Sequence, residues 1–175
     1  NGAEALPAYR AFMSEAVRPG PGRQRDEGRW VAEESWPSPR VQEEVHYLTA
    51  EGTLASYPQP ESVLAVASPQ DSGTSCGEYF SLALDGDVAA DQARDDGQAL
   101  CFNGTVLNEP LEIIGRPVVR LPVAIDAPTG NLIVRLQDVH PDGTSHRVSW
   151  GVLNLAHRGG NETPQAMRPG ETAQV

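Results

Sequence analysis

Hydrophobic and polar residues alternate most regularly in the second half of the chain, over residues 118–125, 131–139 and 145–155. A period of two residues is typical of a strand with one buried face, because successive side chains of a strand point to opposite sides. Short sequences rich in Pro, Asp and Gly separate the three segments and are suited to turns. The pattern therefore predicts three strands joined one after another as a meander.

Shorter alternating segments earlier in the chain predict further strands. They cover residues 8–13, 29–33, 43–48, 53–57, 62–67 and 99–106. Residues 68–97 form a long polar stretch, and residues 158–172 form a loop-like tail. No stripe of apolar residues at helical spacing exceeds about two turns. Many short strands with Gly and Pro between them favour an all-β fold in which two sheets form a sandwich.

Composition and charge narrow the class of protein. The 175 residues suffice for one domain, and 17 Gly with 15 Pro argue against a helical bundle. The net charge is -11, from 24 acidic residues against 13 basic ones, all of them Arg. An acidic surface repels phosphate backbones and anionic lipids, so we expect no nucleic-acid partner and no membrane partner. Because the N-terminus lacks a signal-peptide pattern, we expect a cytoplasmic location.

Neither the cysteines nor the histidines have the spacing of a metal site, so we expect no metal and no cofactor. Cys76 and Cys101 lie outside any C-x-x-C sequence. They are predicted to be two reduced, mostly buried thiols, with a single disulfide as the alternative. The four histidines form no H-x-H or H-x-x-x-H pair.

One serine lies in a sequence that matches the G-x-S-x-G pattern of serine hydrolases. Ser75 occupies the centre of Gly73-Thr74-Ser75-Cys76-Gly77. A nucleophile elbow requires a buried strand before the serine and a helix after it. The surrounding pattern predicts neither, so we expect a turn at Ser75 and no catalytic residue in this chain.

The acidic run that ends the long polar stretch has two interpretations. It lacks the D-x-D-x-D-G-x₅-E spacing of a calcium loop, so we expect a solvated or internally hydrogen-bonded loop. Asp91 and Asp95 are suited to accept backbone N–H groups, and Arg94 is suited to fork onto a carboxylate. We therefore predict a structural loop clamp, made of Asp91, Gln92, Arg94, Asp95 and Asp96.

The tryptophans bear on a second class of function. Trp150 lies on the apolar face of its predicted strand with Val148 and Val152, and we expect it in the core. Trp36 precedes Pro37 and is predicted to be a packing anchor. Exposed aromatic rings in a concave row would instead indicate a carbohydrate-binding β-sandwich module, which is the alternative function that we weigh.

Five sequence segments together resemble one protein family. They are residues 28–37 (GRWVAEESWP), 91–96 (DQARDD), 111–119 (LEIIGRPVV), 134–143 (VRLQDVHPDG) and 151–158 (GVLNLAHR). Their order and spacing are similar to the C-terminal domain of the X-Pro dipeptidyl-peptidase and cocaine-esterase family of serine hydrolases. The resemblance runs from about residue 7 to residue 175.

The resemblance implies a jelly-roll β-sandwich of the galactose-binding-like type, a single domain over residues 1–175. Residues 1–28 would be a linker-like strand and loop that lead into it. The family's domain follows an α/β-hydrolase catalytic domain in the same polypeptide, and the catalytic triad lies outside the matched region. It helps to close the substrate pocket and often takes part in subunit contacts, so a homo-oligomer is expected. Tyr79 and Phe80 best fit the position of an aromatic residue that lines the pocket.

One departure from the family follows the turn at Pro169-Gly170-Glu171. Further β structure normally follows this turn in the family. We therefore expect a sandwich without its last strands, whose unpaired edges promote self-association or strand exchange.

Overall fold

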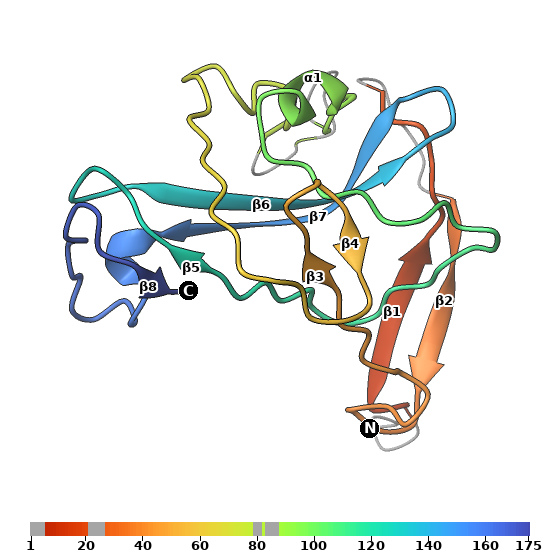
Figure 1. The fold of residues 1–175 in the computed structure, drawn as a ribbon. Helices are drawn as coiled ribbons and strands as arrows, with labels where there is room; N and C mark the ends of the chain where they lie inside the picture. The colour runs from red at the N-terminus through yellow and green to blue at the C-terminus, as the bar shows by residue number, and fades with distance from the viewer. Residues whose placement is uncertain (1–5, 21–26, 79–81, 83–87) are drawn as a thin grey trace. The chain divides into compact units, whose positions relative to one another are not determined.

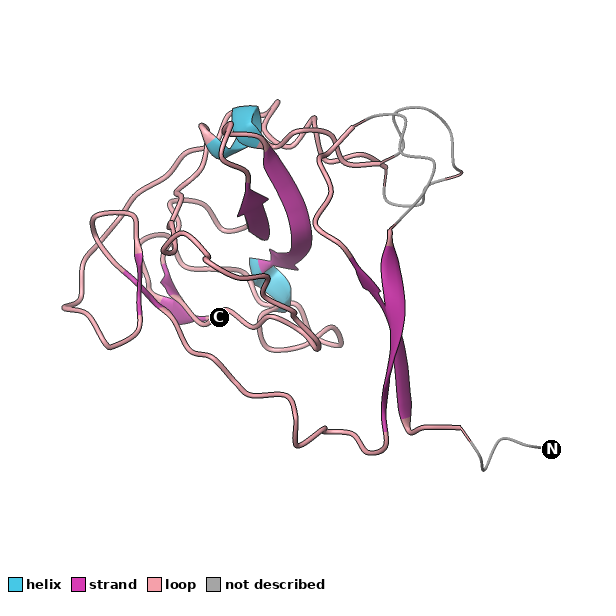
Figure 2. Ribbon diagram, turned by 90° about the vertical axis from the view of Figure 1, so that its right-hand side faces the viewer, coloured by secondary structure: helices cyan, strands magenta, loops and turns pink. Residues whose placement is uncertain are grey.

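The structure is a computed structural model that describes residues 6–20, 27–78, 82 and 88–175. The chain forms two compact units, which we call unit 1 (Asn1–Ile114 with Val139–His146) and unit 2 (Gly115–Asp138 with Arg147–Val175). Strands dominate the regular structure, and the described helices are two single turns, α1 (Ala93–Asp96) and η2 (Leu155–His157) (Figure 2). The all-β class is thereby confirmed.

Unit 1 holds two antiparallel strand pairs (Figure 1). The strands β1 (Tyr9–Ser14) and β2 (Gly28–Glu33) form a two-stranded ribbon. The much shorter strands β3 (Tyr47–Leu48) and β4 (Leu54–Ala55) form the second pair. Both pairs occur where alternation predicts them, although β3 and β4 are shorter than expected.

The remaining strands form two more pairs. The strand β5 (Pro122–Val123) pairs with β8 (Ala173–Gln174), and β6 (Asn131–Val139) pairs with β7 (Ser145–Asn154). The single-turn helix η2 (Leu155–His157) follows β7 directly. No helix in the described part of the chain combines the length and apolar character that crossing a bilayer requires.

The hairpin between β6 and β7 has the predicted turn. The N–H of His140 donates to the carbonyl of Thr144 at 2.8 Å, and the N–H of Gly143 donates back to the carbonyl of His140 at 2.9 Å. Gly143 has φ of 86°, a left-handed conformation that favours glycine. This combination is a three-residue loop that ends in a glycine bulge.

The predicted three-strand meander is wrong, because β5 pairs with β8 and not with β6. Leu121 and Val175 exchange two backbone hydrogen bonds of 2.9 Å beside this pair. The side chains of Leu121, Val123 and Ile125 are still the less exposed ones, so alternation identifies the face correctly. It carries no information on which strand completes the ladder.

Two further strand predictions are also wrong. Residues 62–67 form no strand, and residues 99–106 contribute one isolated bridge between Asn103 and Thr53. In that bridge Leu54 donates to the Asn103 carbonyl, and Asn103 donates to the Gly52 carbonyl, both at 2.9 Å. A single crossing of this kind satisfies two carbonyl groups without a continuous ladder.

Buried side chains differ in kind between the two units. In unit 2 the buried side chains of the described residues are apolar, Leu155 and Met167. Those of unit 1 are all polar: Glu33, Ser38, Thr49, Gln92, Asp95 and Ser145. Unit 1 is therefore organised around hydrogen bonds more than around a hydrophobic core.

The predicted core position of Trp150 is wrong. Its side chain is 47% exposed, and Val148 and Val152 on the same face of β7 are similarly exposed. The guanidinium of Arg147 lies 5.5 Å from the Trp150 ring centroid. The alternation of β7 is real, but no described part of the chain covers this face enough to bury it.

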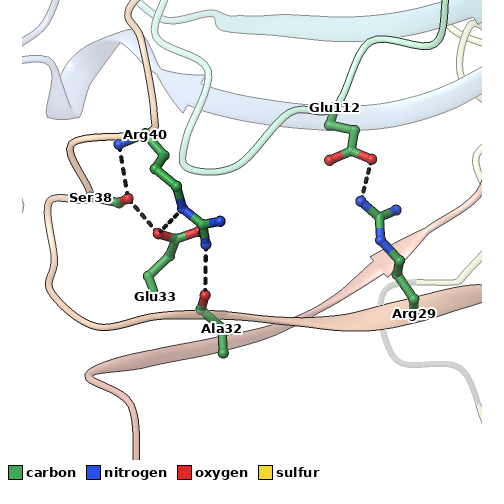
Figure 3. Close-up of polar contacts among 6 residues, drawn as sticks. All are labelled: Arg29, Ala32, Glu33, Ser38, Arg40 and Glu112. Atoms are coloured by element: carbon green, nitrogen blue, oxygen red, sulfur yellow. Dashed lines mark hydrogen bonds and ion pairs between the residues drawn. The ribbon is translucent and has the colours of Figure 1, made fainter.

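Glu33, at the end of β2, closes the loop that follows the ribbon (Figure 3). Arg40 donates to both carboxylate oxygens of Glu33, from Nη2 at 2.6 Å and from Nε at 3.1 Å, and the Ser38 hydroxyl donates as well. Arg40 also donates to the Ala32 carbonyl at 2.9 Å. The hydrogen bonds from Arg40, and then that from Ser38, hold the pKa of Glu33 below its ordinary value.

Two further contacts hold the same face of the ribbon. Arg29 forms an ion pair with Glu112 (Figure 3). Tyr9 stacks on Trp36 with ring centroids 4.5 Å apart and planes 23° from parallel, which supports the predicted role of Trp36 as a packing anchor. The ribbon is thus fixed to unit 1 through its odd-numbered residues.

We expect Glu33→Gln to lower the melting temperature of the protein at neutral pH. The variant should also lose much of the fall in melting temperature that acid causes in wild type. Folding lowers the pKa of Glu33, so the ionised carboxylate stabilises the folded state. This stabilisation is fully present above the ordinary glutamate pKa, about 4.3, and is lost as the pH falls through the lowered pKa. Melting temperatures measured between about pH 7 and pH 3 should converge for wild type and variant at low pH. Glu34→Gln, the same change at an exposed neighbour, is the control, and parallel curves for wild type and Glu33→Gln would contradict the assignment.

Candidate functional site

The predicted clamp residues lie at the short helix α1 (Ala93–Asp96). The Asp91 carboxylate accepts the N–H of Ala93 at 3.0 Å, two residues ahead, which is the local hydrogen bond that starts a turn. The same oxygen accepts the N–H of Ser145 at 2.9 Å. Asp91 therefore joins the start of α1 to the start of β7.

Gln92 is completely buried and joins three stretches of chain. Its side-chain amide donates to the carbonyl of Ser75 at 2.6 Å and to that of Ala90 at 2.8 Å. Its backbone N–H donates to the carbonyl of Ser145 at 3.0 Å. An amide placed in this way satisfies backbone carbonyl groups that burial would otherwise leave costly.

Two more carboxylates receive donors from the protein. Asp95, completely buried, accepts the N–H of Ser75 at 3.2 Å. Asp96 accepts the hydroxyl of Ser145 at 2.6 Å. Within the described residues no group of three or more His, Cys, Asp or Glu side chains is arranged to hold a metal ion. The arrangement is that of carboxylates used as hydrogen-bond acceptors inside the protein.

Arg94 lies outside this cluster. Its guanidinium pairs with Asp71 at 3.1 Å, and the two side chains are 68% and 55% exposed. Exposed pairs of this kind contribute about 0–1 kcal/mol. Arg94 therefore contacts a carboxylate, as its residue type suggests, but through a single hydrogen bond between exposed side chains.

Ser75 lies in a turn, as expected. Gly73 has φ of 92°, and the Cys76 N–H closes the turn on the Gly73 carbonyl at 3.0 Å. Both backbone groups of Ser75 are bonded within the cluster around α1. The described residues directly before Ser75, from 58 to 74, form no strand that could lead into a nucleophile elbow.

The two cysteines are not joined in a disulfide, and they are less buried than expected. Cys76 is half-buried, and Cys101 is exposed. Cys101 approaches the carbonyl of Asp96 at 3.2 Å, and Cys76 approaches that of Gly77 at the same distance.

Tyr79 and Phe80, the predicted wall of the substrate pocket, lie outside the described residues. The residues at the two ends of the segment that carries them, Ser75 and Ala90, are described. The Ala90 N–H donates to the Ser75 carbonyl at 3.0 Å, so the chain leaves and returns at one point. Ser75 and Gln92 join the two ends of the loop.

The sequence prediction missed Ser145, which lies 1% exposed at the centre of the cluster. Its backbone and hydroxyl contact three clamp positions, Asp91, Gln92 and Asp96. The one available signal was a small polar residue directly after a predicted hairpin turn. That signal does not reveal a partner some fifty positions away.

Comparison with known proteins places this chain in a family. The family model described as the X-Pro dipeptidyl-peptidase C-terminal non-catalytic domain matches residues 1–175. The chain belongs to this family. A non-catalytic domain is consistent with a candidate site whose polar groups are bonded to one another.

Two curated relatives from different genera carry esterase names. A protein of Mycobacterium bovis named as a serine esterase is 27% identical over 147 residues, which cover 81% of this chain and 23% of the relative. The cocaine esterase of Rhodococcus sp. strain MB1 Bresler is 28% identical over 159 residues, which cover 83% of this chain and 28% of the relative. The chain thus spans about a quarter of the length of these relatives.

We expect Gln92→Ala to lower the free energy of unfolding by about 2–3 kcal/mol, because the change opens a cavity and removes two buried hydrogen bonds. Arg94→Ala, two residues away, should cost less than about 1 kcal/mol because its ion pair is exposed. Urea unfolding of the two variants and wild type measures both values. Equal losses for the two variants would show that the cluster around Gln92 does not stabilise unit 1.

Proposed function

We propose that this chain is the accessory domain of a serine hydrolase, a jelly-roll sandwich over residues 1–175. In this proposal an α/β-hydrolase catalytic domain of the same polypeptide supplies the nucleophile, its base and the acid. The accessory domain shapes the substrate pocket and contributes domain or subunit contacts. The protein to which it belongs is proposed to be cytoplasmic.

One observation carries the proposal. The residues that sequence alone singles out for chemistry, Ser75 and the acids of residues 91–96, are hydrogen-bonded to one another and to the backbone. A serine nucleophile requires a base at its hydroxyl, and a cation site requires open carboxylate oxygens. The cluster around α1 supports a structural role instead.

The same cluster supports the proposed pocket wall. Gln92 and Asp95 hold the base of the loop between Ser75 and Ala90, and both are completely buried. Fixing the two ends of a segment reduces the conformational entropy that its residues lose when substrate binds. We therefore propose Tyr79 and Phe80 as contacts on the acyl side of the pocket.

The names of the relatives favour an ester as the substrate class. Both curated relatives described above are named esterases. We propose that the whole protein cleaves an ester through an acyl-enzyme intermediate, in preference to an X-Pro peptide.

The alternative, a carbohydrate-binding module, receives less support from the tryptophans. Sugar platforms require a bare ring face, and each Trp already has a neighbour on its ring. The neighbours are Arg10 for Trp30, Tyr9 for Trp36 and Arg147 for Trp150. Within each unit the described tryptophans therefore resemble packed or docking side chains more than an open platform.

A fluorophosphonate probe, which labels activated serines, tests the proposed division of labour. We expect the full-length protein to be labelled and Ser75→Ala to leave the labelling unchanged. Hydrolysis of p-nitrophenyl butyrate should exceed hydrolysis of an X-Pro p-nitroanilide. Loss of labelling in Ser75→Ala would place the nucleophile in this chain and overturn the proposal.

We also propose that the full-length protein is a homo-oligomer that uses the apolar face of β7. Val148, Trp150 and Val152 lie there with about half of each side chain exposed. Trp150→Ser should lower the molar mass measured by light scattering at micromolar concentration, and Tyr57→Ser, at an exposed aromatic residue of unit 1, should not. A monomeric wild type would contradict this part of the proposal.

A further inference from the structure

The β1–β2 ribbon has one face fixed to unit 1 and one open face. The register pairs Phe12 with Trp30 and Arg10 with Ala32, so these four side chains share a face. Every residue of that face is exposed. We call it the open ribbon face, and it consists of Arg10, Phe12, Ser14, Gly28, Trp30 and Ala32.

The open ribbon face presents large aromatic rings in a fixed arrangement. Trp30 is 66% exposed and Phe12 is 39% exposed. Their ring centroids lie 5.7 Å apart with planes 71° from parallel, an edge-to-face contact. A Cβ at Gly28 would lie 2.8 Å from the Phe12 ring, so the absence of a side chain at Gly28 makes room for this ring. The two rings therefore pack against each other on the open ribbon face.

Arg10 is placed unlike the other described arginines of unit 1. Those four each pair with a carboxylate of the same unit, namely Arg18, Arg29, Arg40 and Arg94. The guanidinium of Arg10 instead lies 5.5 Å from the Trp30 ring centroid. In a chain with net charge -11, this arginine is free to take a carboxylate from outside the unit.

We infer that the open ribbon face docks on the catalytic domain of the same polypeptide, against an apolar patch that carries a carboxylate for Arg10. Trp and Arg are enriched among the residues that dominate the binding energy of protein interfaces. About three-quarters of each curated relative lies outside the matched region, which leaves room for a second domain in the same polypeptide. A covalent link raises the effective concentration of one domain at the other, so a small contact face is enough for stable docking.

A second copy of the chain fits this face less well. A two-fold interface brings the same patch of both copies together. The open ribbon face contains Arg10 but no acidic residue, so Arg10 would find no carboxylate on the matching face of the other copy. The catalytic domain is therefore the occupant that the charge pattern favours. This inference rests on the proposed function only in requiring a second folded domain.

Hydrogen–deuterium exchange tests the inference by comparing the full-length wild type with its variants Trp30→Ala and Arg10→Glu. We expect one contiguous segment outside residues 1–175 to exchange about thirtyfold faster in both variants, the fold-change that the loss of an interface hot spot produces. Tyr57→Ala, at an aromatic residue 67% exposed in the same unit, is the matched control and should change nothing there. Arg10→Glu keeps both rings, so it reports on docking even where Trp30→Ala disturbs the ribbon.

Each outcome of this experiment supports or overturns the inference. Changes confined to residues 1–175 in both variants overturn docking on the catalytic domain. A fall in molar mass on light scattering, without faster exchange in the catalytic domain, assigns the face to a second copy and also overturns it. Fluorophosphonate labelling of wild type is read separately. An unlabelled protein with the expected exchange pattern refutes the proposed function and leaves the docking face supported.

Discussion

The buried side-chain amide of Gln92 is the interaction on which the organisation of unit 1 depends. The amide donates to the carbonyls of Ser75 and Ala90, and the backbone N–H of the same residue donates to the carbonyl of Ser145 at the start of β7. Hydrogen bonds are directional, and leaving one member of a buried network without its partner costs more than making the bond gains. Unit 1 is therefore held in one arrangement by polar specificity, where a domain with a larger apolar core would rely on packing.

Because the buried side chains of unit 1 are polar, large apolar side chains remain on the surface. Trp30 in unit 1 and Trp150 in unit 2 each keep about half or more of their surface exposed. Large exposed apolar groups are typical of surfaces that a partner covers. In the proposed arrangement the catalytic domain is this partner, and its contact would bury apolar side chains that the described residues leave exposed.

Sequence patterns predict those parts of the fold whose partners are close in the chain. The β6–β7 hairpin follows from alternation and from the turn at residues 140–143, since Pro141 and Gly143 suit its geometry. The pairing of β5 with β8 does not follow, because Pro122 and Ala173 are some fifty residues apart and alternation specifies a face without a partner. The helix α1 is too short for periodicity and depends on tertiary hydrogen bonds.

The candidate site shows the same limit for side chains. Asp91 and Asp95 accept backbone N–H groups, which their position in an Asp-rich turn indicates. Arg94, in the same motif, pairs with exposed Asp71 because residue 94 lies on the outer side of a single helical turn. One motif thus divides into buried acceptors that fix a loop and a surface arginine that does not. The same division in the ribbon, where Glu33 faces inward and Trp30 outward, places stability on one face and leaves the other for docking.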